Sequence, residues 1–299
     1  PTETVYGLAG NAYNVEAVEK IFALKKRPHY NPLIVHIATA DQLNQVAKAI
    51  PEAALTLALE FWPGPLTLVL KKQSIISDAV SSGKDTVAVR VPNHPLTLEL
   101  LKRIDYPLAA PSANPFGSIS PTNAKHVRSY FENHLELILD GGDCERGIES
   151  TIIGFENETP VLYRLGSLAL EQIEDKIGRV IVKNQNNDAS PASPGMLSRH
   201  YAPATTTYVT DEIEKLLKAH SDKKIGVLLF QHQLKTVVEH QEVLSTAGDL
   251  TEAAKNLYAA LHRLDSMKLD LIIAEKLPDT GLGKTLNDKL KRASKSANL

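Results

Sequence analysis

The chain alternates between stretches with apolar residues at helical spacing and short runs that are apolar throughout or at every second position. The first helical pattern runs from Val15 to Phe22, and Asn14 just before it suits an N-cap. Pro28 disfavours helical geometry at the residue before it, so we expect this helix to end near Lys26. The sequence therefore predicts an amphipathic helix close to the start of the numbered chain.

Two strands that carry chemically active side chains are predicted in the first third of the chain. Residues 31–37 (NPLIVHI) form a short apolar run, and a histidine inside such a buried strand, His36, must find a partner or face a cavity. Residues 86–91 (TVAVRV) alternate cleanly, which places three valines on one face and Arg90 on the other. A lone arginine in such a strand more often reaches solvent from the sheet edge, so both interpretations of Arg90 stay open here.

Other elements of the first 183 residues follow from the same patterns. Residues 41–59 are helix-like and broken at Pro51, and a short helix is expected over residues 168–177. Further strands are expected over residues 66–70, 135–139, 149–153, 160–166 and 180–182. Helices and strands are thus mixed along this part of the chain, as in an α/β sheet.

A loop dense in hydroxyls and turn formers, PSANPFGSISPT, follows residue 110. Ser120 followed by Pro121 is typical of an N-cap and a first helical residue, which predicts a helix that continues through Tyr130. The exposed N–H groups at this helix start, beside Ser112 and Asn114, would form a cradle for an anion. The same residues are equally typical of a loop whose side chains only cap turns, so this pattern alone does not decide.

The last third of the chain predicts a second domain. Residues 183–193 are polar and rich in asparagine, which indicates a linker. After this stretch strands and helices alternate as in a small α/β unit, with strands over residues 206–210, 225–230 and 269–274 and helices over residues 211–220 and 251–265.

The composition is that of an ordinary globular protein. The chain has 299 residues, which is long enough for two domains. Of these residues 43% are hydrophobic and 23% are charged. The net charge of −2 gives no overall attraction to nucleic acid or anionic lipid, and a single cysteine excludes a disulfide framework. No apolar run approaches ~18 residues and no secretory leader is visible, so we expect a cytoplasmic protein without a membrane partner. Because the chain opens on Pro1, we also expect that a native N-terminal segment precedes it.

Cations and an imidazole recur between the predicted elements. Lys25 and Arg27 follow the first helix, where the helix macrodipole alone favours positive charge. Near them stand a histidine in a buried strand, His36, an arginine on a sheet face, Arg90, and the loop rich in serine and asparagine. Taken with the family resemblance of the motifs below, these features are better explained by one substrate cavity than by dipole compensation.

The motifs PTETVYGL, K-x-R-P, NPLIVHI, TVAVRVP, APSAN, ESTII, Y-R-x-G and SPGM-x-x-RHYAP occur in this order along the chain. In this combination the chain resembles the YrdC-type threonylcarbamoyl-AMP synthases, in their long form with a C-terminal extension. The resemblance implies an α/β fold, with a twisted mixed sheet and an open cavity in the catalytic domain and a small Rossmann-like C-terminal domain. The implied boundaries are residues 1–183 for the catalytic domain, 184–204 for a linker across the active site and 205–299 for the extension.

The resemblance also implies a reaction. Such enzymes join L-threonine, bicarbonate and ATP, with Mg²⁺ accompanying the nucleotide, into threonylcarbamoyl adenylate and pyrophosphate. A downstream transferase complex then modifies adenosine 37 of tRNA. No protein-bound metal or organic prosthetic group is expected.

Site residues carried over from the family fall into three groups. The residues implied near the phosphates as catalytic groups are Lys25 and Arg27. The residues implied around L-threonine are Thr4, His36, Arg90, Ala110 and Ser150. The residues implied around ATP are Arg27, Asn31, Thr86, Ser112, Asn114, Ser120, Arg164, His200 and Tyr201.

One alternative function comes from another class. A basic concavity of this kind could bind the backbone phosphates of double-stranded RNA or tRNA without any chemistry. The slight overall acidity and the lack of basic runs interleaved with aromatic residues argue against such a module. Direct tRNA contact remains compatible with the enzyme but is not required by it.

Overall fold

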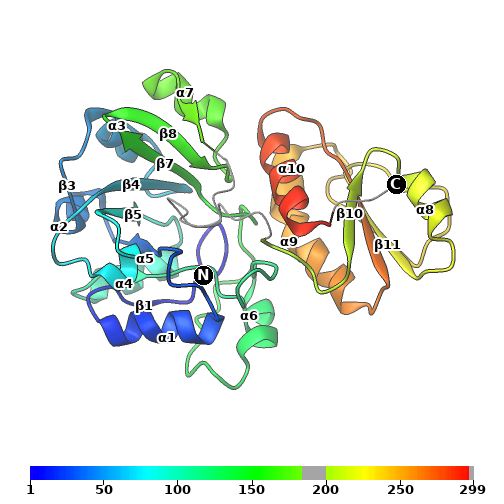
Figure 1. Ribbon diagram of the computed structural model, residues 1–299, viewed down its shortest axis with the longest axis horizontal. Coiled ribbons are helices and arrows are strands. Elements are labelled where there is room, and N and C mark those ends of the chain that lie inside the picture. Colours follow the sequence, from blue (N-terminus) through cyan, green and yellow to red (C-terminus); the bar gives the residue numbers. More distant parts are fainter. Residues whose placement is uncertain (184–199, 296–299) are drawn as a thin grey trace.

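Two lobes, each built around its own sheet, make up the computed structural model of the chain, which describes residues 1–183 and 200–295 (Figure 1). Strands up to β9 belong to the first sheet and strands from β10 onward to the second. Of the predicted linker, residues 184–199 lie outside the described residues.

Within the described residues the first sheet has nine strands and is mixed. The order is β1-β6-β2-β5-β4-β7-β8-β9, with β3 paired to β4. Parallel pairs (β2 with β5, β4 with β7, β8 with β9) alternate with antiparallel ones, which confirms the predicted twisted mixed α/β sheet. The strands are β1 (Gly10–Asn11), β2 (Ile34–His36), β3 (Ala47–Lys48), β4 (Leu66–Lys72), β5 (Thr86–Arg90), β6 (Leu108–Ala109), β7 (Thr151–Glu156), β8 (Thr159–Arg164) and β9 (Ile181–Val182).

The first helix, α1 (Val15–Lys25), begins and ends as its sequence predicts. The Asn14 side chain accepts a hydrogen bond from the Ala17 amide, and Lys26 ends the helix with a left-handed backbone at φ 52°. The other helices of this lobe are α2 (Leu43–Val46), α3 (Glu52–Phe61), α4 (Asp78–Ser81), α5 (Pro95–Arg103), α6 (Ala124–Phe131) and α7 (Leu170–Ile177), with a 3₁₀ turn at Ala40–Gln42.

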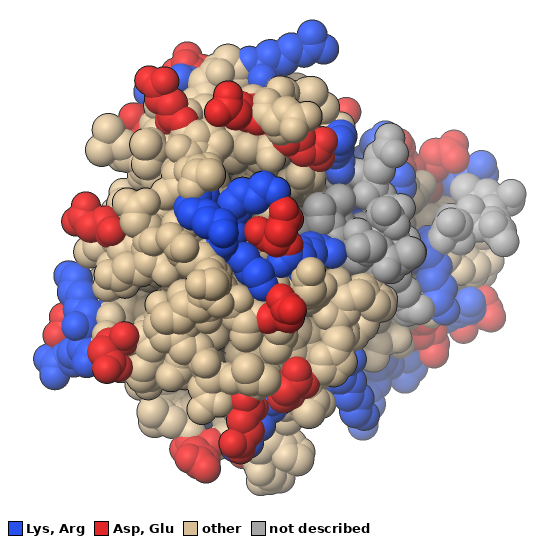
Figure 2. Space-filling model, turned by 60° about the vertical axis from the view of Figure 1, so that its left-hand side comes forward, with Lys and Arg blue, Asp and Glu red and all other residues tan. Residues whose placement is uncertain are grey.

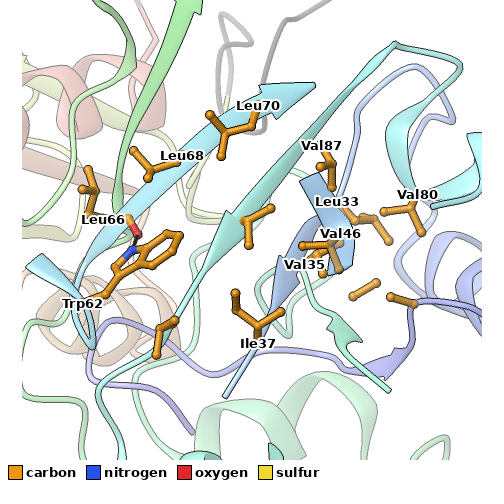
Figure 3. Packing of buried hydrophobic residues seen from close by; sticks show 14 of the residues in the cluster. Leu33, Val35, Ile37, Val46, Trp62, Leu66, Leu68, Leu70, Val80 and Val87 are labelled. Carbon is orange, nitrogen blue, oxygen red and sulfur yellow. Dashed lines mark hydrogen bonds between the residues drawn. The ribbon is translucent and has the colours of Figure 1, made fainter. Parts of the chain in front are cut away.

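The core of the first lobe lies on one face of the central strands (Figure 3). Leu66, Leu68 and Leu70 alternate along β4 and pack with Val35 of β2 and other valines of the neighbouring strand. Burying each such side chain contributes about 1.5–3 kcal/mol relative to leaving it exposed. This packing fixes β2 and β5 side by side, and both strands end at the candidate site.

The second lobe has a four-stranded sheet within the described residues, in the order β10-β13-β11-β12 with all pairs parallel. Helices α9 and α10 cover the face toward the first lobe and α8 the opposite side (Figure 1), which agrees with the Rossmann-like unit expected. The elements are β10 (Thr207–Thr210), α8 (Ile213–Ala219), β11 (Ile225–Leu229), β12 (His240–Val243), α9 (Leu250–Ser266), β13 (Leu271–Glu275) and α10 (Leu282–Ala293).

The lobes share apolar and aromatic contacts. Val5, Ile119 and Ile148 of the first lobe belong to the same buried cluster as the apolar face of α9. The rings of His126 on α6 and His262 on α9 are stacked with centroids 3.8 Å apart. The two sheets therefore meet through a packed interface rather than through a chain connection alone.

Two expectations about local structure are wrong. Residues 135–139 form no strand. Helix α6 begins at Ala124 with Asn123 as its N-cap, because the Ser120 hydroxyl bonds a carboxylate of another segment instead of the helix amides. Of the two interpretations left open for this loop, an anion cradle at a helix start beside Pro121 is therefore not formed. In the part of the chain that the structure describes, no helix is both long and apolar enough to span a membrane.

Candidate active site

A cavity of about 350 Å³ brings together segments that are far apart in the sequence. Arg27, His36 and Arg90 all line it, so the three groups singled out from the sequence surround one common space. Figure 2 shows basic side chains gathered in the middle of one face, with acidic atoms among them. The polar and charged lining includes Thr4, Arg27, His36, Arg90, Ser112, Glu149, Ser150, Arg164, His200 and Tyr201.

Arg90 is fixed at the end of β5 by three contacts. Its Nε donates to the Gly64 carbonyl at 3.1 Å, its Nη1 donates to Thr4 Oγ1 at 2.9 Å, and its Nη2 lies 2.6 Å from Glu3 Oε1. A guanidinium carries five N–H groups, and the contact with Glu3 is an ion pair rather than a hydrogen bond, so at least one donor remains on each Nη, a pair that suits a carboxylate. Arg90 lies in a central strand and is buried, so the edge-strand interpretation is wrong.

His36 lies beside Arg90, because β2 and β5 are parallel and these two residues are register partners. Its ring is buried, and its Nδ1 has no hydrogen-bond partner among the described residues. Burial and then the charge of Arg90 lower the pKa of His36 to about 3, so the ring is neutral near pH 7. A neutral imidazole here can bond a small polar ligand without adding charge.

Arg27 is held by the turn that follows α1. Its Nε donates to the Asn31 carbonyl at 2.9 Å, and its Nη2 donates to Asn31 Oδ1 at 2.7 Å and to the Pro32 carbonyl at 2.8 Å. Burial and then the charge of Arg164 lower the pKa of Arg27 to about 9. Two cations therefore face the cavity close enough to repel each other, and an anion bound between them would relieve that repulsion.

Arg164 ends β8 and lies against the residue before β7, Ser150. Its Nε and Nη2 donate to the Ser150 carbonyl at 3.0 and 2.8 Å, and Nη2 also donates to Ser150 Oγ at 3.0 Å. The same Oγ shares a 2.7 Å hydrogen bond with Thr67 Oγ1. The Ser150 hydroxyl is thus held in place between β4 and Arg164.

The Lys25 ammonium donates to backbone carbonyls inside the protein and does not face the cavity. Its Nζ donates to the Ser112 carbonyl at 2.6 Å and to the Asn114 carbonyl, which ties α1 to the loop after β6. Burial and then the charge of Arg27 hold the pKa of Lys25 well below its ordinary value. Lys25 does not line the cavity, so its role beside the phosphates stays a prediction, whereas its contacts shape the loop that carries Ser112.

A carboxylate, Glu149, lines the cavity and is held from the second lobe. Its Oε1 accepts from Ser120 Oγ at 2.6 Å, and its Oε2 accepts from Tyr258 Oη at 2.8 Å and lies 3.4 Å from Lys289 Nζ. Lys289 also donates to Tyr201 Oη at 3.1 Å. Burial alone would raise the pKa of Glu149, but the charge of Lys289 and then that of a cavity arginine outweigh it and lower the pKa.

His200 and Tyr201 close one side of the cavity just before β10. The His200 ring meets the rings of Phe116 and Tyr201 edge-on, at centroid distances of 5.8 and 4.1 Å. Burial and then the charge of Arg27 hold the pKa of His200 well below its ordinary value. The two rings therefore form an aromatic wall beside the cations, and the His200 ring in it is neutral.

The structure separates the residues expected at the site into two groups. Those that line the cavity are Thr4, Arg27, His36, Arg90, Ala110, Ser112, Ser150, Arg164, His200 and Tyr201. Those that do not are Lys25, Asn31, Thr86, Asn114 and Ser120. Of the second group, Lys25, Asn31 and Ser120 each bond a lining residue, and Thr86 lies at the opposite end of β5 from Arg90.

Sequence reasoning assigned no role to Glu3 or Glu149, although both lie in motifs that it singled out, PTET and ESTII. Their positions one residue before a predicted lining residue were the available signal. Tyr258 and Lys289 could not be found, because nothing in their local sequence points to another domain. In residues 1–183 and 200–295, no group of three or more His, Cys, Asp or Glu is arranged to hold a metal ion.

Comparisons with known proteins identify the family of the chain. A family model described as Telomere recombination (Sua5, YciO and YrdC) matches residues 1–166, and one described as Threonylcarbamoyl-AMP synthase, C-terminal domain, matches residues 168–295. The chain is 42% identical to the threonylcarbamoyl-AMP synthase of Pyrococcus abyssi, over 98% of this chain and 89% of the relative. It is also 42% identical to that of Bacillus subtilis, over 98% of this chain and 88% of the relative.

A solved structure agrees as well. The crystal structure of P. abyssi Sua5 complexed with L-threonine matches with a TM-score of 0.93 and 42% identity, covering 98% of this chain and 89% of that one. Both family models and the relatives that match over 98% of this chain thus indicate the same family. The chain belongs to the Sua5/YrdC family of threonylcarbamoyl-AMP synthases, with the C-terminal domain of the longer members.

Proposed function

We propose that this chain is an L-threonylcarbamoyladenylate synthase, a nucleotidyltransferase that forms threonylcarbamoyl-AMP and pyrophosphate from L-threonine, bicarbonate and ATP. The observation that carries the proposal is a single cavity with two kinds of positive site. Arg90 presents two N–H donors, which suit an amino-acid carboxylate, while Arg27 and Arg164 repel each other, which suits a polyanion.

We assign L-threonine to the end of the cavity at Arg90. The carboxylate would accept from one N–H on each Nη of Arg90, and the hydroxyl would bond short polar groups nearby. The P. abyssi relative solved with L-threonine supports this ligand. The remaining residues of this proposed pocket are Thr4, His36, Ala110 and Ser150.

We assign the ATP phosphates to the side of Arg27 and Arg164. Ser112, His200 and Tyr201 would complete the nucleotide site from the lining, whereas Asn31 would act by holding Arg27. Mg²⁺ would enter with the substrate as Mg·ATP, because the described residues offer cations and hydroxyls rather than a carboxylate cluster. Its chemistry there is to offset charge on the phosphates.

The proposed reaction needs no covalent enzyme intermediate. The neutral threonine amine attacks bicarbonate, or carbon dioxide formed from it by loss of water. A C–N bond forms, one C–O bond of bicarbonate breaks, and the amine proton and that oxygen leave as water, which gives a carbamate. A carbamate oxygen then attacks the α-phosphorus of ATP while the bond to the β-phosphate oxygen breaks and pyrophosphate leaves. Arg27 and Arg164 would stabilise the charge on the leaving pyrophosphate, and the cavity would contribute mainly by holding the two substrates in line.

The alternative, a module that binds double-stranded RNA or tRNA, is not favoured. The cavity arginines are 3–7% exposed, whereas a surface that follows a phosphate backbone presents its cations to solvent. Transfer of the threonylcarbamoyl group to adenosine 37 of tRNA would require a downstream transferase complex as partner. A cytoplasmic location remains our expectation, because this reaction would supply tRNA modification.

The test is incubation of the purified chain with labelled bicarbonate, Mg·ATP and each amino acid in turn. With L-threonine we expect an adenylate that carries the bicarbonate label, together with released pyrophosphate. With L-valine, which lacks the hydroxyl, we expect much less of both products. Tight tRNA binding that weakens steeply with salt, without any ATP turnover, would instead support the binding module.

A further inference from the structure

Lys289 of the second lobe is buried behind the cavity of the first lobe. It lies on α10, the helix that faces the first lobe in Figure 1, and is 1% exposed. Its Nζ lies 3.4 Å from Glu149 Oε2, donates to Tyr201 Oη at 3.1 Å and stands 4.4 Å from the centre of the Tyr201 ring. Both partners line the cavity, and Lys289 does not.

A buried ammonium group is costly unless its partners compensate for the lost hydration. Lys289 has such partners in a carboxylate, a phenol oxygen and an aromatic face. Tyr258 Oη and Ser120 Oγ complete the set around the Glu149 carboxylate. The network therefore spans both lobes. The side chains of Glu149 and Tyr201, which line the cavity, link the Lys289 ammonium to the space assigned to the nucleotide.

We propose that Lys289 is a positioning residue for the nucleotide site. Lys289 holds the Glu149 carboxylate toward the second lobe and fixes the Tyr201 ring as part of the cavity wall. The C-terminal domain thereby contributes to nucleotide affinity without touching the nucleotide. This inference rests on the proposed function for the identity of the nucleotide, ATP.

The consequence of losing Lys289 follows from the charges around Glu149. The other cation that lowers the pKa of this carboxyl is Arg164, which lines the cavity. Without Lys289, Arg164 would be the remaining one of these two cations that attracts the Glu149 carboxylate. The negative charge of that carboxylate would then oppose the binding of phosphates at Arg164. The threonine end, at Arg90, has a separate acidic partner in Glu3 and should be less affected.

The test compares three variants of the full chain. Lys289→Met removes the charge at similar volume, Lys289→Arg keeps it, and Lys284→Met is the matched control. Lys284 lies on the same helix and also bridges the lobes, 2.7 Å from Glu171, but that pair is solvent-exposed and lies away from the cavity. Thermal unfolding of the three variants would be measured in parallel.

For Lys289→Met we expect the KM for ATP to rise on the order of tenfold, while kcat and the KM for threonine change less than about threefold. Lys289→Arg should recover most of the ATP affinity, and Lys284→Met should match the wild type. A Lys289→Met variant that weakens ATP and threonine equally, or one that binds ATP as the wild type does, would overturn the proposal.

A double-mutant cycle tests whether Lys289 acts through Glu149. If it does, Lys289→Met should weaken ATP binding no further when Glu149 is already changed to Gln. Full additivity would refute this route. Calorimetry with Mg·ATP keeps the result independent of turnover: a wild type that binds ATP but makes no adenylate would refute the proposed function, and the variants would still test the network.

Discussion

Arg90→Lys separates the two substrates that the cavity is proposed to hold. In the wild type the guanidinium donates two hydrogen bonds, to Gly64 and Thr4, forms an ion pair with Glu3, and keeps one N–H on each Nη for a carboxylate. A lysine ammonium has three donors on one nitrogen, and Glu3 would still take one of them. The positive charge would remain, but the planar pair of donors would be lost.

The expected magnitude is that of one charge-assisted hydrogen bond. Such a bond contributes about 1.5–3 kcal/mol, so the KM for threonine should rise roughly 10- to 150-fold. The KM for ATP should change by less than about threefold, because the nucleotide is assigned to the other arginines. The assay is continuous release of pyrophosphate, with threonine varied at saturating ATP and bicarbonate, and then with ATP varied.

L-Threoninol, which has a CH₂OH group in place of the carboxylate, provides the control. Wild type and Arg90→Lys should bind this analogue with nearly equal affinity, because its lost carboxylate is the group that Arg90 is assigned to recognise. Calorimetry would measure this comparison directly. Equal loss for threonine and ATP, or equal loss for threonine and threoninol, would refute the carboxylate assignment.

Three further variants test other parts of the structure. Arg27→Ala should abolish adenylate formation while circular dichroism shows a folded protein, because the repelling pair proposed to bind phosphates is lost; normal pyrophosphate release would contradict this role. Leu68→Ala, at a fully buried position, should lower the free energy of unfolding by about 2–5 kcal/mol in urea titrations. A loss below about 1 kcal/mol would argue against this core. His36→Asn should flatten the acid dependence of stability. The pKa of His36 is lowered to about 3 in the fold, against about 6.5 when unfolded, so its contribution is present above pH ~6.5 and is lost as the pH falls toward 3. Urea unfolding at pH 7.5 and 4.5 should therefore show a larger loss for wild type, and equal losses would refute the assignment.

The periodic elements could be predicted from the sequence because their signals are local. The capped helix Val15–Lys25 and the alternating strand Thr86–Arg90 are present as expected. Residues 135–139 look like a strand by composition, yet none of the strands in the described residues pairs with them. Three of their leucines and an isoleucine line the cavity instead, and no local pattern distinguishes these outcomes.

The site was only partly predictable for a related reason. Residues expected at the cavity were found through motifs, and those that line it lie near the ends of strands or in adjoining loops. Lys25 and Ser120 carry suitable chemistry, but the Lys25 ammonium donates to two backbone carbonyls and the Ser120 hydroxyl donates to a carboxylate, all from distant segments. Which partner such a group meets depends on long-range packing, which spacing along one chain does not specify.

The apolar cluster shared by the lobes has a consequence for dissecting the protein. Val5, Ile119 and Ile148 come from the first 183 residues but are covered by α9 of the other half. If either half were expressed separately, its apolar interface would be exposed to solvent. Each fragment should therefore aggregate or misfold more readily than the intact chain. Melting of the whole polypeptide should accordingly occur in one cooperative step, and co-expressed halves should rescue each other.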